Sequence, residues 1–97
     1  MEDSRWTIIE SKEIDDGWCL AVSLADLVFE VTIDRRYAED LIGQGCDLEK
    51  AKLLVDLSFE FLLERESPSA ILKRFNLEDI RIYFPEYEKE IRQKFLN

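Results

Sequence analysis

Histidine is absent from this 97-residue chain, and glycine, cysteine and proline occur only three, two and two times. Without an imidazole, the chain lacks the usual general base at neutral pH, the Ser–His and Cys–His nucleophile pairs and the commonest metal ligand. The glycines, at positions 17, 43 and 45, form neither a Walker loop nor a G-x-G-x-x-G motif. We therefore expect no catalytic activity, no cofactor and no bound transition metal.

The two cysteines show none of the paired spacings that mark zinc or redox sites. Cys19 falls in a predicted strand, and Cys46 falls in the loop "GQGC". We expect both to be reduced thiols, as is usual in the cytosol. A disulfide between them is the alternative.

Long apolar runs are also missing, since none approaches the ~20 residues needed to span a bilayer. The N-terminal "MEDSRW" is acidic, whereas a signal peptide begins with basic residues. Hydrophobic residues make up 46% of the chain, which is enough to build one core. The sequence therefore predicts a single cytoplasmic domain over residues 1–97 that is soluble and not bound to a membrane.

Positive charge is scarce in the first two thirds of the chain. Residues 1–66 carry 17 acidic and 7 basic groups, whereas residues 67–97 carry 5 acidic and 6 basic groups, for a net charge of −9. Nucleic acid is an unfavourable partner for such a molecule, because affinity for it depends on neutralising phosphates. The acidic surface is explained most simply by solubility. A protein partner with a basic surface is the alternative, and the formation of a homo-oligomer is left open.

Carboxylates are the one abundant reactive group, with 22 Asp and Glu residues. Glu60 and Glu64 lie one helical turn apart, and Glu49 and Asp56 lie two turns apart. Such spacings suit an acid/base pair, but they equally describe the solvated face of a helix, and nothing marks one of these groups as buried. This pattern favours a protein that is not an enzyme, and leaves a small carboxylate enzyme as the distant alternative.

The N-terminal third has the pattern of β-strands. "RWTIIESKEI" is followed by the turn signal "DDG", and then by "WCLAVSL" and "LVFEVTI". In the second of these runs bulky residues alternate with small ones, so that both faces of the strand can be covered to some degree. Three short strands in succession predict an antiparallel meander.

The remaining residues have helical periodicity. Asp34 is a suitable N-cap for a helix that ends at Gly43, and Asp47 caps the longest helix, roughly 48–66. Apolar residues cover more than half of that helix, so we expect it to lie at the centre with Phe61 and Leu57 fully buried. Short helices over 69–75 and 77–84, with a left-handed turn at Asn76 between them, and a last helix over 86–95 complete the prediction. The predicted fold is α+β, a three-stranded meander followed by about five helices gathered on one face of the sheet.

Residues 71–88, "ILKRFNLEDIRIYFPEYE", resemble the DNA-binding helix-turn-helix of tetracycline-repressor-type regulators. The resemblance rests on the aromatic string Tyr83-Phe84-Pro85, followed by Glu86, at the end of the second short helix. It implies a recognition helix, and therefore a DNA-associated regulator.

Three features depart from that family's pattern. The second helix has barely two turns, Glu78 and Asp79 stand at its N-terminal end, and Tyr87 occupies a position where the family often has a phosphate-binding lysine. The apolar residues of the segment also follow the i, i+3, i+4 spacing of a buried helix face. These features favour an amphipathic helical corner, whose basic patch of Lys73, Arg74 and Arg81 suits a protein contact better than DNA.

Residues 58–87 are also similar to a segment of small uncharacterised bacterial proteins of about this length, which implies a stand-alone bacterial domain and no particular activity. Taken together, the sequence predicts a small non-catalytic protein that acts as a protein–protein interaction or regulatory module. Aromatic residues and arginine are favoured at binding hot spots. The candidate partner-binding residues, for each of which core packing is the alternative, are Trp18, Tyr37, Arg74, Arg81, Tyr83 and Tyr87.

Overall fold

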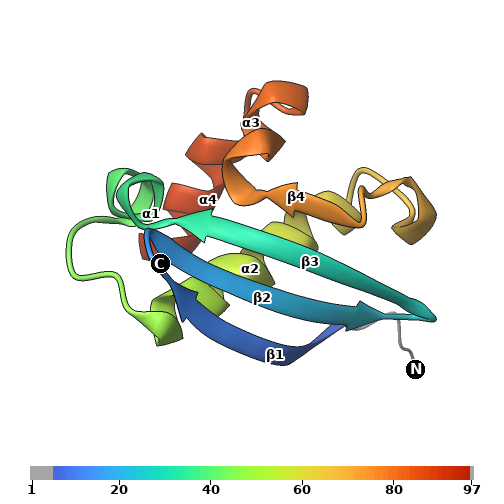
Figure 1. The fold of residues 1–97 in the computed structure, drawn as a ribbon. Coiled ribbons are helices and arrows are strands. Elements are labelled where there is room, and N and C mark those ends of the chain that lie inside the picture. Colours follow the sequence, from blue (N-terminus) through green and yellow to red (C-terminus); the bar gives the residue numbers. More distant parts are fainter. Residues whose placement is uncertain (1–5, 97) are drawn as a thin grey trace.

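The strands of the N-terminal third form one sheet with a later segment of the chain. The computed structural model describes residues 6–96. Its strands are β1 (Trp6–Ile14), β2 (Gly17–Leu24), β3 (Leu27–Asp34) and β4 (Arg74–Asn76), in the sheet order β1-β2-β3-β4 (Figure 1). The pairs β1–β2 and β2–β3 are antiparallel, which confirms the predicted meander. The fourth strand pairs with β3 in the parallel direction and was not predicted.

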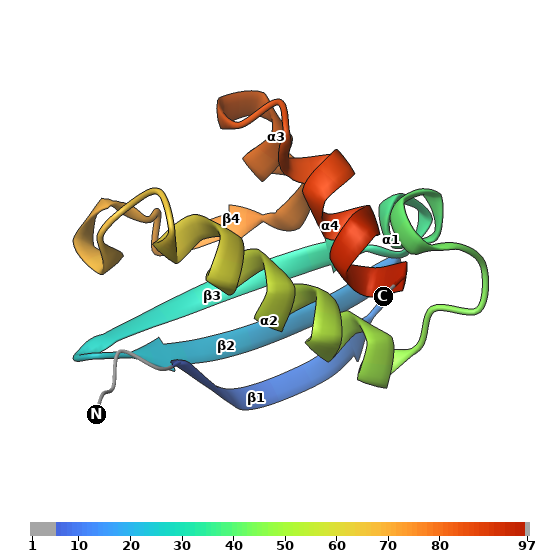
Figure 2. The same cartoon turned by 180° about the vertical axis from the view of Figure 1, so that it is seen from behind.

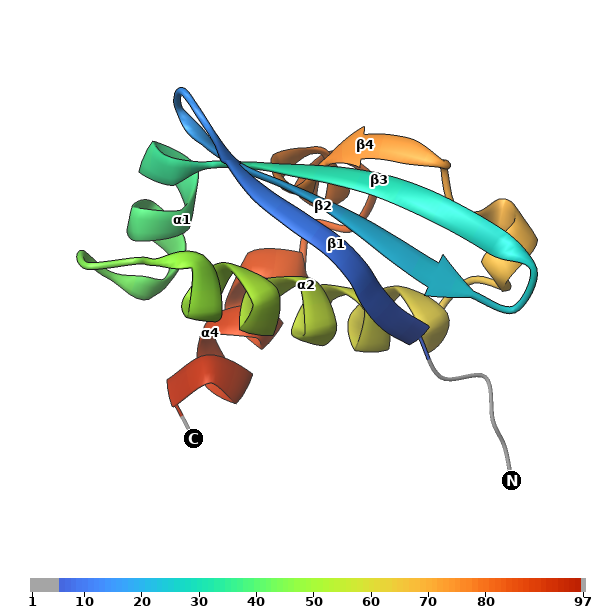
Figure 3. The same ribbon diagram turned by 60° about the horizontal axis from the view of Figure 1, so that its bottom comes forward.

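Four α-helices follow the meander within the described residues: α1 (Arg35–Ile42), α2 (Leu48–Leu63), α3 (Ile80–Tyr83) and α4 (Tyr87–Leu96). The predicted caps are confirmed, because the carboxylates of Asp34 and Asp47 accept the N–H groups of Tyr37 and Lys50. Figures 2 and 3 show α2 and α4 on the same side of the sheet. The domain is therefore α+β, as the sequence predicts.

Helix α2 lies at the centre, with one aromatic ring directed at the sheet and another directed at the C-terminal helices. Phe59 packs edge-on against Phe29 of the sheet, with ring centroids 5.5 Å apart. Phe61 faces the C-terminal helices and lies 5.2 Å from the ring of Tyr87. The predicted burial of Phe61 is confirmed, whereas full burial of Leu57 is wrong, because this side chain is only partly buried. Residues 64–66, predicted to extend the helix, form a turn.

The predicted helix over residues 69–75 is wrong. The segment contains one 3₁₀ turn, η1 (Pro68–Ala70), and then strand β4. The N–H of Glu30 donates to the carbonyl of Lys73 at 2.8 Å, so the edge of β3 draws this segment into the sheet. Within β4, Phe75 is buried and pairs with Val31, whereas Arg74 on its other side is exposed, as expected from the alternation of side chains along a strand.

The second predicted short helix, over residues 77–84, divides into a 3₁₀ turn, η2 (Leu77–Asp79), and α3. Asn76 does not adopt the predicted left-handed turn, since its φ is −93°. Its side chain instead accepts the N–H of Glu78, while the carboxylate of Asp79 accepts the N–H of Asn76. This reciprocal capping box begins a 3₁₀ turn at the position where the sequence predicts a helix–helix corner.

Arg65 connects the end of α2 to the start of α4. Its guanidinium binds the carboxylates of Glu86 and Glu90, each at 3.0 Å, and that of Glu64 at 3.2 Å. The same group donates to the carbonyl of Phe61 and lies 3.7 Å from the centre of the Phe61 ring. One side chain therefore joins two helices and covers an aromatic ring of the core.

Replacing Arg65 by methionine should lower the free energy of unfolding by about 1–2 kcal/mol, because it removes a cation–π contact and several partly solvated ion pairs. The pKa of Glu86 lies below its usual range, first because of a backbone hydrogen bond and then because of Arg65. A carboxyl group with a lowered folded-state pKa stabilises the fold above its unfolded pKa, and this contribution is lost as the pH falls through the folded value. The difference between Arg65→Met and wild type should therefore narrow below about pH 4.

Urea titrations at neutral and acid pH measure this difference, with Arg36→Met on the exposed face of α1 as the charge-matched control. An Arg65→Met protein no less stable than the Arg36→Met control would contradict the role assigned to Arg65.

Candidate functional site

One face of the sheet is covered by helices and the other is not, within residues 6–96. Along β2, Trp18, Leu20 and Val22 are buried, whereas the alternate residues Cys19 and Ala21 are only partly buried. We call the uncovered side the open face, and it carries the side chains of Glu10, Lys12, Cys19, Ala21, Val28, Glu30 and Arg74. Because side chains alternate along a strand, the same alternation that builds the core leaves the small residues of β2 on the open face.

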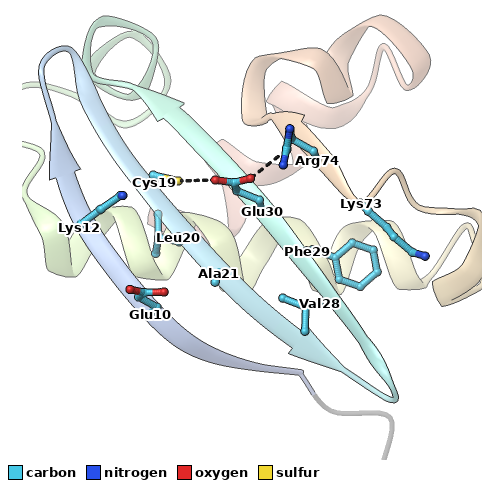
Figure 4. A pocket seen from close by; sticks show the side chains of 10 residues that line it. All are labelled: Glu10, Lys12, Cys19, Leu20, Ala21, Val28, Phe29, Glu30, Lys73 and Arg74. Carbon is cyan, nitrogen blue, oxygen red and sulfur yellow. Dashed lines mark hydrogen bonds and ion pairs between the residues drawn. The ribbon is translucent and has the colours of Figure 1, made fainter.

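The open face contains a shallow depression of about 510 Å³. Ala21 lies at its floor, directly between Glu10 on β1 and Glu30 on β3 in the strand register. Figure 4 shows the charged side chains around this floor, with Lys73 and Arg74 on the side of β4. A floor of small side chains within a charged border gives the face room for the side chains of another molecule.

Glu30 lies between two neighbours on this face. One of its carboxylate oxygens lies 2.9 Å from Nε of Arg74, and the other lies 3.5 Å from Sγ of Cys19 (Figure 4). With Glu30 paired, the remaining charges that line the depression are Glu10, Lys12 and Lys73. The lining as a whole has three basic and two acidic groups, a local charge of +1 on a chain whose net charge is −9.

The thiols are poorly suited to nucleophilic chemistry. Burial, and then the hydrogen bond to Glu30 and its charge, raise the pKa of Cys19. Burial, followed by the charge of Asp47, raises the pKa of Cys46. Both groups are therefore protonated at neutral pH, and the thiolate is the reactive form. Within residues 6–96, no group of three or more acidic or cysteine side chains is arranged to hold a metal ion.

Three of the predicted partner-binding aromatics, Trp18, Tyr37 and Tyr87, are buried in the core, which is the alternative that the sequence leaves open for each of them. Trp18 packs under the guanidinium of Arg35, 4.6 Å from the ring centre. Tyr37 donates its hydroxyl hydrogen bond to Glu88 at 2.8 Å, and Tyr87 is fully buried. Each ring is used to join elements that are distant in sequence, which the residue type alone does not reveal.

The other three predicted residues are exposed but lie in two places. Arg74 borders the open face, whereas Arg81 and Tyr83 lie on α3 at the C-terminal corner. Arg81 lies 3.0 Å from Glu78 and 3.9 Å from Glu88, so its charge is largely balanced locally. The six predicted residues therefore do not form one surface.

Sequence reasoning missed the residues that form most of the open face, among them Lys12, Ala21 and Val28. The usable signal is the alternation of small and bulky residues in "WCLAVSL", which predicts that both faces of the strand are covered to some degree. In the structure the bulky side is buried under the helices, whereas the small side is only partly buried and, within the described residues, has no helix over it.

The two-helix geometry expected for residues 71–88 is absent, because residues 74–76 form a strand and α3 has only four residues. The DNA-associated alternative therefore loses the element on which it depended. Among residues 6–96, no helix has the length and apolar character needed to cross a membrane.

Comparisons of the chain with models of protein families, with curated proteins and with solved structures give no match. Function is therefore inferred from the surfaces of the molecule itself.

Proposed function

We propose that this chain is a non-catalytic protein-binding module that receives a partner polypeptide on its open face. The observation that carries this proposal is the uncovered side of the sheet, with a floor of small side chains and a charged border. An uncovered sheet face within a small domain exposes ordered backbone and apolar surface, such as the Val28 side chain, which is 56% exposed. Such a surface is already fixed in shape before a partner arrives.

A protein partner suits this face better than nucleic acid. Single-stranded nucleic acids are bound on sheets by exposed aromatic rings that stack on the bases. The aromatic residues on the strands of the sheet all belong to the covered side or pack against it: Trp6, Trp18, Phe29 and Phe75. The net charge of −9 disfavours a long phosphate backbone that extends beyond this face, whereas a short acidic segment can stay within its locally positive lining.

Catalysis on this face has no support in its residue chemistry. It offers one cysteine whose pKa is raised, carboxylates near basic groups, and no histidine. A nucleophile with neither a lowered pKa nor an adjacent base is weak. Binding is therefore the function that these residues can perform.

The partner that fits best presents an acidic segment with a small apolar side chain. Lys12 and Lys73 border the depression from opposite sides, and no ion pair joins either to a carboxylate within residues 6–96. Carboxylates of the partner would reach these two ammonium groups, while an apolar side chain would rest on Ala21 and Val28. Charge pairing of this kind at the border sets orientation and association rate.

The test uses affinity capture from the native host with two substitutions on the open face. Ala21→Tyr fills the floor with a residue that strands tolerate well, and Lys12→Glu reverses one border charge. We expect each to reduce capture of the same partner about tenfold, with unchanged melting temperature. The matched controls are Gln93→Tyr and Lys89→Glu on the exposed side of α4, which should leave capture unchanged. A partner captured equally by Ala21→Tyr and by wild type would contradict the proposal.

A further inference from the structure

A second depression lies at the C-terminal corner, between the end of α2 and the segment from η1 to α3. We call it the corner groove. Its volume is about 180 Å³, and its floor is formed by the buried side chains Leu62, Ile71, Phe75 and Ile80. This is smaller than the roughly 300–1,000 Å³ of a site for a drug-sized molecule, so it fits one large apolar side chain of a macromolecule.

Two exposed apolar side chains border the corner groove. Leu72, which is 57% exposed, precedes β4, and Tyr83, which is 67% exposed, ends α3. Single exposed apolar residues are ordinary on protein surfaces. Here, however, two of them continue the apolar floor outward from separate chain segments, which is the arrangement expected of a binding groove.

The charged residues that line the corner groove are both acidic. Asp79 accepts the N–H of Asn76, which holds its carboxylate in place. Glu66 lies in the turn that follows α2, and no lysine or arginine lines the groove within residues 6–96. The groove therefore combines an apolar floor with negative charge, on a molecule that is itself strongly acidic.

We propose that the corner groove binds a short basic segment of another protein, which inserts one leucine or phenylalanine side chain between Leu72 and Tyr83. A lysine or arginine beside the inserted residue would pair with Glu66. Apolar anchors beside complementary charges are a recurring mode of peptide recognition. The corner groove shares no lining residue with the depression on the open face, so the proposal does not rest on the function proposed for that face.

The test measures binding of fluorescent peptides by anisotropy. The probe is a short lysine-rich peptide with one central leucine. Its two controls have serine in place of the leucine, or glutamates in place of the lysines. We expect the leucine-containing basic peptide to bind at least about tenfold more tightly than either control. Equal binding of the serine peptide would mean plain charge attraction and would overturn the proposal, as would tighter binding of the acidic peptide.

Variants of the protein test whether the peptide binds in the corner groove. Tyr83→Ser should weaken binding about tenfold, whereas Ile82→Ser should not, although Ile82 is equally exposed and is its neighbour on α3. Glu66→Lys should weaken binding more than Asp40→Lys does. Asp40 is an exposed residue of α1, and its replacement by lysine changes the net charge by the same amount. Equal effects of Tyr83→Ser and Ile82→Ser would overturn the proposal. So would a wild-type dimer that Tyr83→Ser dissociates, because the groove would then be occupied by a second copy.

Discussion

Replacing Phe61 by alanine should cost about 3–5 kcal/mol of unfolding free energy, as deletions of buried aromatic rings do. The Phe61 side chain is fully buried, and its ring contacts those of Tyr87 and Phe84, with centroids 5.2 and 5.7 Å away. Arg65 covers the ring face at 3.7 Å, so the substitution also removes that cation–π contact. Because the ring joins α2 to two later segments, the cavity cannot collapse by moving one side chain.

A domain with a typical stability of about 5–15 kcal/mol would lose a large share of it. Urea unfolding followed by tryptophan fluorescence measures the change, with Leu53→Ala as the control on the exposed side of the same helix. The control should change stability by well under half as much. A Phe61→Ala protein whose melting temperature lies within a few degrees of that of wild type would contradict the prediction, because the packing of α2 would then not depend on this ring.

Much of the fold could be predicted because its signals are local. The turn residues before Gly17 and the alternation along β2 specify a hairpin without reference to the rest of the chain. In the same way, the carboxylates of Asp34 and Asp47 begin α1 and α2 within three residues of their own position. Capping and alternation act over a few residues, so a sequence shows them directly.

Strand β4 could not be predicted in this way, because its partner lies more than 40 residues earlier. Phe75 pairs with Val31 in the sheet, and the N–H of Glu30 binds the carbonyl of Lys73. The apolar residues of this segment fit a helical period and a strand period almost equally well over so short a run. The free edge of β3 selects the strand over the helix, and the sequence of the segment itself does not specify that pairing.

The candidate surfaces were predicted less well than the fold. Tyr83 and Tyr87 are the same residue type four positions apart, yet the first is 67% exposed and the second is fully buried. The difference arises because α4 places Tyr87 against Ser58 of α2, where the two hydroxyls lie 2.6 Å apart. Which side of the sheet is covered depends likewise on where distant helices pack, and composition along one strand does not determine it.

After Phe61→Ala, the largest loss of stability is expected from Gly17→Ala, which adds only one methyl group. This buried glycine begins β2, and its backbone is not in the left-handed region, so its role is not one of conformational freedom. A Cβ added here would overlap the carbonyl oxygen of Ile33 and would come within 3.0 Å of the backbone nitrogen of Arg35. That nitrogen donates to the carbonyl of Asp16 at 2.6 Å, so the backbone on both sides is already fixed.

Relieving this overlap requires the β1–β2 turn or the end of β3 to move, since the obstructing atoms belong to the backbone and not to a flexible side chain. We therefore expect Gly17→Ala to cost about 3 kcal/mol, at the upper end of the usual penalty for overpacking. Gly45→Ala is the informative comparison in a urea titration. At Gly45 φ is +84° and no atom lies within 4 Å of an added Cβ, so only backbone strain of about 1–2 kcal/mol should appear. A Gly17→Ala protein as stable as Gly45→Ala would mean that the turn moves easily, and that close approach of the β3 backbone at Ile33 is not what requires a glycine here.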